Sequence, residues 1–163
     1  LYAGDYNKFL ESLPDRNDSY FIFYKGIADY YLKNSASAKK HFDEAYRLTP
    51  DQIFAQIGKT FSLSIEGKNM EALELIKSSE EKIKSSGVSD GEAIYKIAQA
   101  YAVLGDKSSA LAMFRLSIEK GFFCYPYFLQ DILLDNIRKE KEFIELLEIS
   151  RKRHEEFKKQ FAS

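Results

Sequence analysis

Apolar residues recur every three or four positions along most of this chain, which is the period of an amphipathic α-helix. In the stretch 95–121, YKIAQAYAVLGDKSSALAMFRLSIEKG, two such runs are separated by Gly105, which suits a helix end, and Asp106, which suits an N-cap. On each run a small residue precedes an aromatic one. These residues are Ala98 and Tyr101, then Ala110 and Phe114. Small residues beside large ones let two helices approach closely, so the stretch predicts an antiparallel helical hairpin.

The same arrangement recurs along the chain. Hairpins are predicted at about 18–50, 50–87 and 89–121, and the residues before them read as the second half of another unit. The small residues of the second helices are Ala38, Ala72 and Ala110. Two capping sequences predict helix starts near residues 50 and 90, namely Thr49-Pro50-Asp51-Gln52 and Ser89-Asp90-Gly91-Glu92.

The aromatic-rich stretch 20–31, YFIFYKGIADYY, allows two helical registers. With Gly26 at the helix contact, Lys25 and Asp29 face inward; with Ala28 there, the inward residues are Tyr24, Ile27 and Tyr31. Burying an unpaired charge is costly, so we expect the second register. The aromatic side chains predict core packing, and a stacking platform for a ligand is the alternative.

Residues 122–163 follow a different pattern. We expect short helical turns at 126–130 and 133–138, then a long helix from about residue 140 to residue 161. Its apolar face consists of Phe143, Leu146, Leu147, Phe157 and Phe161. This helix is expected to cover the open end of the preceding hairpins in a monomer. A homodimer formed through the last helix is the alternative.

These patterns resemble the tetratricopeptide repeat (TPR) family. The matching residues are Ala38, Phe42, Ala45 and Pro50, then Phe54, Gly58, Phe61, Ala72 and Ile76, then Ile94, Ala98, Tyr101, Ala110 and Phe114. The last part is similar to a tail that follows many bacterial TPR arrays, through Asp131, Leu134, Asp135, Ile137, Arg138, Phe143, Leu146 and Leu147. The resemblance implies an all-α fold. It would be a right-handed superhelix of antiparallel hairpins over 1–121 with capping helices over 122–163.

The resemblance also implies a function, a protein–protein interaction scaffold that binds a peptide or partner helix in its concave groove. The groove would be lined by Gln56, Lys59, Ser62, Tyr95, Lys96 and Gln99. Its two lysines would suit an acidic peptide or a chain-terminal carboxylate. The alternative is a regulatory or sensory C-terminal TPR segment of a larger bacterial signalling protein, a protein kinase or a transcription regulator.

Composition excludes several other classes. The formal net charge of −1 gives no overall basic field for nucleic acid. The single cysteine, Cys124, excludes an internal disulfide and a cysteine-cluster zinc site. No apolar run approaches the ~20 residues of a membrane span, and no signal peptide is recognised. We expect a cytoplasmic protein, cut from a longer chain because it starts at Leu1 rather than Met.

No residue pattern predicts catalysis or metal binding. His41 and His154 lie on separate predicted helices, with no carboxylates or cysteines in metal spacing around them. Cys124 has no histidine partner that the sequence reveals. We therefore expect no enzymatic activity, no metal and no cofactor.

Overall fold

The computed structural model describes residues 1–14, 16–87 and 90–161, with the backbone alone at Ser86 and Phe161. All regular elements within these residues are helices, so the all-α class is confirmed for the described part of the chain. The finer expectation of a right-handed TPR superhelix is not confirmed. None of these helices combines the length and the apolar character of a membrane span.

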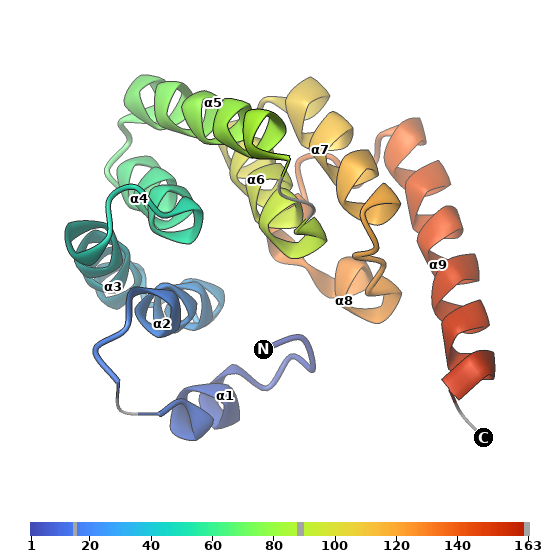
Figure 1. Cartoon of the computed structure of the whole chain (residues 1–163), viewed down its shortest axis with the longest axis horizontal. Coiled ribbons are helices and arrows are strands. Elements are labelled where there is room, and N and C mark those ends of the chain that lie inside the picture. Colours follow the sequence, from blue (N-terminus) through green and yellow to red (C-terminus); the bar gives the residue numbers. More distant parts are fainter. Residues whose placement is uncertain (15, 88–89, 162–163) are drawn as a thin grey trace. The chain divides into compact units, whose positions relative to one another are not determined.

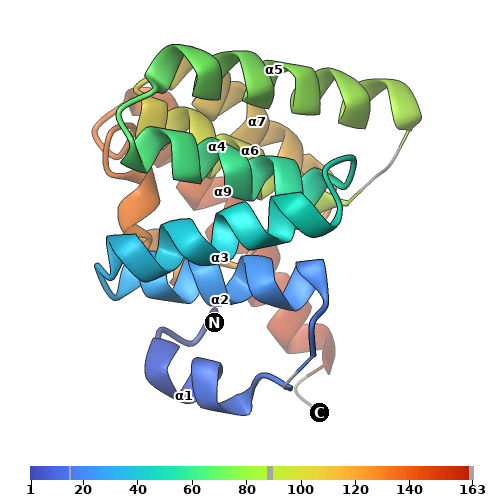
Figure 2. The ribbon, with the colours of Figure 1, turned by 90° about the vertical axis from the view of Figure 1, so that its left-hand side faces the viewer.

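The first compact unit, residues 1–86, is a stack of helices in chain order (Figure 1). α2 packs against α1 and α3, and α4 packs against α3 and α5. Figure 2 shows α2, α3 and α4 lying side by side. The helices are α1 (Tyr6–Ser12), α2 (Ser19–Tyr31), α3 (Ser35–Leu48), α4 (Ile53–Ile65) and α5 (Asn69–Ser86).

The second compact unit, residues 87–163, combines one long hairpin with the segment that follows it. α6 packs against α7 and η1, and α9 packs against α7 and α8. The elements are α6 (Gly91–Leu104), α7 (Lys107–Glu119), α8 (Tyr125–Gln130), the 3-10 helix η1 (Ile132–Leu134) and α9 (Lys141–Phe161). The sequence predicts a boundary after residue 121, whereas the packing divides the chain after Ser86.

The hairpin predicted from residues 95–121 is present as α6 and α7. Gly105 ends α6 in the left-handed conformation at φ 81°, which glycine adopts without a steric penalty. Asp106 caps α7 by accepting a hydrogen bond from the backbone N–H of Ser109. The small and aromatic residues that predicted the close contact, Ala98, Tyr101, Ala110 and Phe114, are all fully buried.

The helix starts near residues 50 and 90 were predicted with unequal success. Asp90 caps α6 through the backbone N–H groups of Glu92 and Ala93, while Ser89 lies outside the described residues. The capping box at Thr49 is wrong. α4 begins at Ile53, and the Thr49 hydroxyl instead donates to the Ser19 hydroxyl at 2.5 Å. Thr49 therefore connects the end of α3 to the start of α2.

The aromatic-rich stretch forms core, as expected, but its register differs from the expectation. Gly26 lies directly against α3, because a Cβ atom there would lie 2.6 Å from Cδ1 and Cε1 of Phe42. Ala28 is buried as well, together with Tyr24, Ile27 and Tyr31. The buried Asp29 is tolerated because His41 of α3 provides a hydrogen-bonding partner.

The tail elements lie close to their predicted positions, with α8 and η1 in place of the two turns and α9 as the final helix. Phe143 and Leu146 are buried on α9, and Leu147 is half-buried. Phe157 is 50% exposed, and its ring contacts Phe123. The side chain of Phe161 lies outside the described residues. α9 packs against α7 and α8, with Phe143 and Leu146 buried near its start and Ser150 buried further along.

We predict that Gly26→Ala lowers the free energy of unfolding by about 1–3 kcal/mol, because the new methyl group must displace the Phe42 ring. This cost should exceed the roughly 0.5–1 kcal/mol that alanine gains over glycine inside a helix. Urea unfolding followed by circular dichroism measures the change.

Gly58→Ala in α4 is the matched control, since its Cβ would lie 3.1 Å from the rings of Phe23 and Phe42 and needs a smaller shift. A Gly26→Ala protein as stable as the Gly58→Ala protein would contradict the close approach of α2 and α3.

Candidate functional site

The six predicted groove residues are divided between the two units, and nearly all are buried. In the first unit Gln56 and Ser62 are buried and Lys59 is half-buried; in the second, Tyr95, Lys96 and Gln99 have no exposed surface. Burial alone does not test a partner-binding role. It means that the contacts of each side chain within the chain must be considered first.

In the first unit, Lys59 and Ser62 converge on one carboxylate, that of Asp43 on α3. The Lys59 Nζ donates at 2.8 Å and the Ser62 hydroxyl at 2.7 Å, and Lys39 of α3 adds a third contact at 2.7 Å. Burial alone would raise the pKa of Asp43, but hydrogen bonds from these three residues lower that pKa to about 2. Both predicted groove residues therefore connect α4 to α3.

Gln56, also on α4, makes two hydrogen bonds. Its Nε2 donates to the Pro50 carbonyl at 2.9 Å, and its Oε1 accepts from the Ser79 hydroxyl of α5 at 3.1 Å. The side chain thus joins α4 to the turn before it and to α5.

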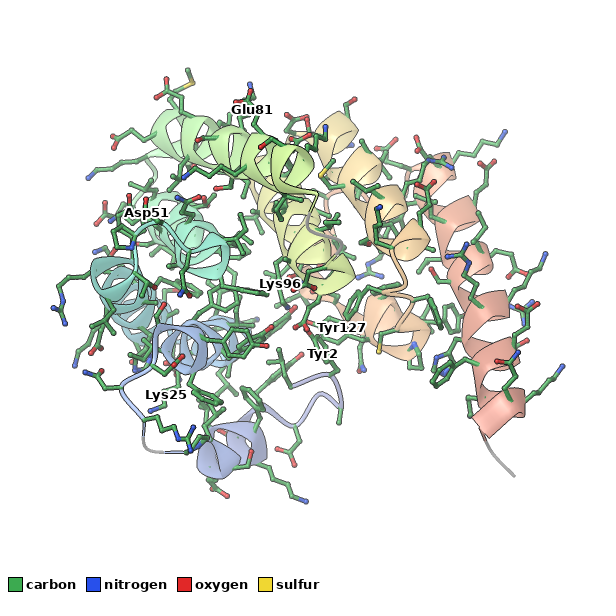
Figure 3. The ribbon with its side chains drawn as sticks, in the orientation of Figure 1. Tyr2, Lys25, Asp51, Glu81, Lys96 and Tyr127 are labelled. Atoms are coloured by element: carbon green, nitrogen blue, oxygen red, sulfur yellow. The ribbon has the colours of Figure 1, made fainter. Side chains whose placement is uncertain are left out.

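In the second unit the other three predicted residues do come together, in what we call the buried polar cluster. It consists of Tyr95, Lys96 and Gln99 on α6, Tyr127 on α8, and Asp131 at the start of η1. Figure 3 shows Lys96 and Tyr127 near one another. This cluster is the candidate functional site, because buried ionisable groups gather at functional sites more often than elsewhere.

The carboxylate of Asp131 is the centre of the cluster. Its Oδ2 accepts from the Tyr95 hydroxyl in a short hydrogen bond and from Gln99 Nε2 at 2.5 Å. Its Oδ1 accepts from the backbone N–H of Leu133 at 2.9 Å, which caps η1. Gln99 Nε2 also lies 3.5 Å from the Tyr127 hydroxyl. A buried carboxylate needs several donors, and here α6 supplies two of them.

Lys96 is fully buried beside this carboxylate. Its Nζ lies 5.6 Å from the ring centroid of Tyr95 and 5.8 Å from that of Tyr127, within the range of cation–π attraction. Burial lowers the pKa of Lys96 to about 8, although the charges of Asp131 and Glu92 act in the opposite direction. The ammonium group is therefore held in a site where losing its proton is easier than in water.

Arg138 fixes the backbone that carries Asp131. Its guanidinium donates to the carbonyl of Asp131 at 2.6 Å, to the carbonyl of Leu129 at 2.9 Å and to the carboxylate of Asp135 at 2.9 Å. Its Cζ lies 5.9 Å from the ring centroid of Phe143. The tail residues Asp131, Asp135 and Arg138, noted in the sequence, thus form one connected arrangement.

Cys124 and His41, the residues considered as a nucleophile or metal ligand, lie outside the buried polar cluster. Cys124 is half-buried, and burial raises the pKa of its thiol, which disfavours the reactive thiolate. His41 Nδ1 lies 2.8 Å from the carboxylate of Asp29, a partner that the sequence pattern did not reveal. Within residues 1–14, 16–87 and 90–161 no three histidine, cysteine or acidic residues lie together as metal ligands do.

Sequence comparison assigns the chain to a family. Residues 53–158, well over half of the chain, match the family described as A/B hydrolase-like, N-terminal domain, and the chain belongs to that family. Searches of curated proteins and of solved structures give no match.

The assignment corrects the resemblance to the TPR family, which is wrong. The scaffold function and the alternative signalling segment, both inferred from that resemblance, are withdrawn with it. The physical reason is that a small residue, an aromatic neighbour and a capped turn are what any close antiparallel helix pair requires. These features predicted the α6–α7 hairpin correctly, but they do not specify a family.

We predict that Asp131→Asn lowers the free energy of unfolding by about 3 kcal/mol at neutral pH. The amide keeps the shape of the side chain but removes the negative charge beside Lys96 and turns one acceptor into a donor facing Tyr95 and Gln99. Urea unfolding measures the effect.

Asp135→Asn is the matched control. Its carboxylate is 62% exposed and pairs with Arg138, and such pairs contribute no more than about 1 kcal/mol. Equal losses in the two variants would show that burial of the Asp131 charge is not what stabilises the unit.

We also predict that stability rises with pH above neutrality because of Lys96. The pKa of Lys96 is about 8 in the folded protein, whereas an unfolded lysine keeps its proton to about pH 10.4. The unfolded state therefore binds more protons between these values, and the free energy of unfolding should increase by up to about 1.4 kcal/mol per pH unit.

Urea unfolding between about pH 7.5 and 9.5, below the range of unperturbed tyrosines, measures this slope. Lys96→Met should abolish the rise, and Lys120→Met, which removes an exposed lysine, should leave it unchanged. A wild-type profile as flat as that of Lys96→Met would contradict the lowered pKa.

Proposed function

We propose that this chain is a non-catalytic helical domain that precedes an α/β-hydrolase-like domain and contacts it. The observation that carries the proposal is the family match over residues 53–158, whose description places such domains N-terminal in A/B hydrolase-like proteins. The hydrolase-like domain is then the protein partner, and the helical domain contributes a contact surface rather than reacting groups.

The local chemistry supports a non-catalytic role. In α/β-hydrolases the nucleophile is placed on a sharp turn between a strand and a helix. The described residues of this chain form helices joined by short turns, which is a different scaffold. Cys124, the strongest nucleophile by residue type, has a thiol whose pKa burial raises.

Several polar side chains of the two units are engaged in structural contacts. Tyr95 and Gln99 donate to Asp131, and Lys59 and Ser62 donate to Asp43. In each case the hydrogen bonds join one helix to another element of the same unit. Such contacts favour a rigid domain, which suits a role in supporting a neighbouring domain.

An assay of the purified chain tests the non-catalytic part. With p-nitrophenyl esters of short and long acyl chains, we expect no release of p-nitrophenol above the rate in buffer. Turnover by the wild-type chain that Cys124→Ser or His41→Gln abolishes would overturn this part of the proposal.

A binding measurement tests the contact. We expect the chain to co-elute in size-exclusion chromatography with the α/β-hydrolase-like domain encoded by the same reading frame. The control is a hydrolase-like domain from an unrelated protein, which should elute separately. Separate elution of the cognate pair would contradict the proposed contact, and a reading frame with no such domain would overturn the proposal as a whole.

A further inference from the structure

A cavity in the first unit lies away from all the contacts described so far except the Asp29–His41 pair. Its volume is about 300 Å³, at the lower end of the sizes that hold small molecules. The segment between α1 and α2 contributes two lining residues, and α2 and α3 contribute two each. The lining residues are Arg16, Asn17, Ile22, Lys25, His41 and Glu44.

Two permanent cations and one imidazole reach this cavity from three different segments. Arg16 is exposed and Lys25 is half-buried, and neither forms an ion pair with an acidic residue in the described part of the chain. Elsewhere on α3 the pattern is different, because Lys39 contacts both Asp43 and Glu66. The positive charge at the cavity is therefore left for a ligand.

His41 is oriented for such a ligand by Asp29. The carboxylate of Asp29 is 10% exposed and lies 2.8 Å from Nδ1 of His41. A carboxylate accepts hydrogen bonds, so Nδ1 carries the proton and Nε2 is the ring nitrogen left for contact with a ligand. This pairing fixes the ring plane at the cavity wall and also accounts for the buried charge on α2.

Glu44 restricts which anions can bind. Among the described residues that line the cavity it is the acidic one, and the side-chain charges of Arg16, Lys25 and Glu44 sum to +1. An anion that also carries an O–H group can donate a hydrogen bond to the Glu44 carboxylate, whereas an anion without one is repelled by it.

We propose that this cavity binds a small oxyanion that carries a hydroxyl hydrogen, such as hydrogen phosphate. Arg16 and Lys25 neutralise the charge, and Nε2 of His41 and the Glu44 carboxylate are the two acceptors offered to the hydroxyl hydrogen. The proposal is independent of the hydrolase-like partner domain, so its failure would leave the proposed function untouched.

The test is a titration of the ¹⁵N-labelled chain at neutral pH and constant ionic strength, followed by backbone amide shifts. The probes are inorganic phosphate, sulfate as an oxyanion without the hydroxyl hydrogen, and acetate as a carboxylate. We expect saturable shifts at Asn17, Lys25, His41 and Glu44 with phosphate and weaker binding of sulfate and acetate. Shifts that stay linear with phosphate concentration would overturn the proposal, and tighter binding of acetate would assign the site to carboxylates instead.

Charge variants sharpen the test. Lys25→Gln and Arg16→Gln should each weaken phosphate binding by about tenfold, the loss expected when one hydrogen bond to a charged group is removed. Lys40→Gln is the matched control, because Lys40 is an exposed lysine of α3 that does not line the cavity. Glu44→Gln should bring the affinities for phosphate and sulfate together.

If Lys40→Gln weakens phosphate binding as much as the cavity variants do, the anions respond only to the net charge of the protein. That result would overturn the proposed site. Circular dichroism checks that each variant is folded. Arg16 is exposed and lies between α1 and α2, so Arg16→Gln should not disturb helix packing. It therefore tests the site even if Lys25→Gln alters the packing of α2.

Discussion

The second unit depends on satisfying one buried negative charge, the carboxylate of Asp131. A carboxylate in the protein interior is stable only when donors and a compensating charge surround it. Tyr95 and Gln99 of α6 provide the donors, and Lys96 provides the charge. Since these residues lie more than thirty positions before Asp131, the contact fixes the start of η1 to α6. Arg138 then satisfies the carbonyl groups of the same turn, so the chain reaches α9 along a defined path.

The first unit uses the same principle with two carboxylates, Asp43, which is closer to water, and Asp29, which is buried. Asp43 joins α3 to α4 through Lys59 and Ser62, and Asp29 joins α2 to α3 through His41. Screening by solvent weakens the contacts of Asp43, but each of the two carboxylates joins one helix to another. The polar residues that a helical pattern offers as ligand contacts are thus largely bonded inside their own unit. The cavity for which we propose anion binding is lined in part by side chains outside these contacts, Lys25 and Arg16.

Local signals in the sequence predicted local structure well. Gly105 and Asp106 determine a helix end and a helix start within a few residues, so the α6–α7 hairpin follows from the sequence alone. The burial of Tyr95 could not be predicted in this way. Helical periodicity identifies one apolar face of α6. Nothing in the sequence near Tyr95 reveals that its hydroxyl will bond to Asp131, far along the chain. The residues expected inside α2 are buried, but the expectation that Asp29 faces outward is wrong, because its partner His41 could not be seen in the sequence pattern. The family could not be predicted from the hairpin pattern either, because many helical proteins share the same packing rules.

The contact between Gly26 and Phe42 has a consequence for the motions of the first unit. The Phe42 ring lies against Gly26 of α2 and also against Gly58 of α4, so one aromatic ring fills the space between three successive helices. An aromatic ring sweeps out more volume when it turns over than when it rests, and tightly packed interiors leave no such volume. Rotation of this ring therefore requires α2, α3 and α4 to separate briefly. The rate at which the Phe42 ring flips therefore reports how often these three helices separate.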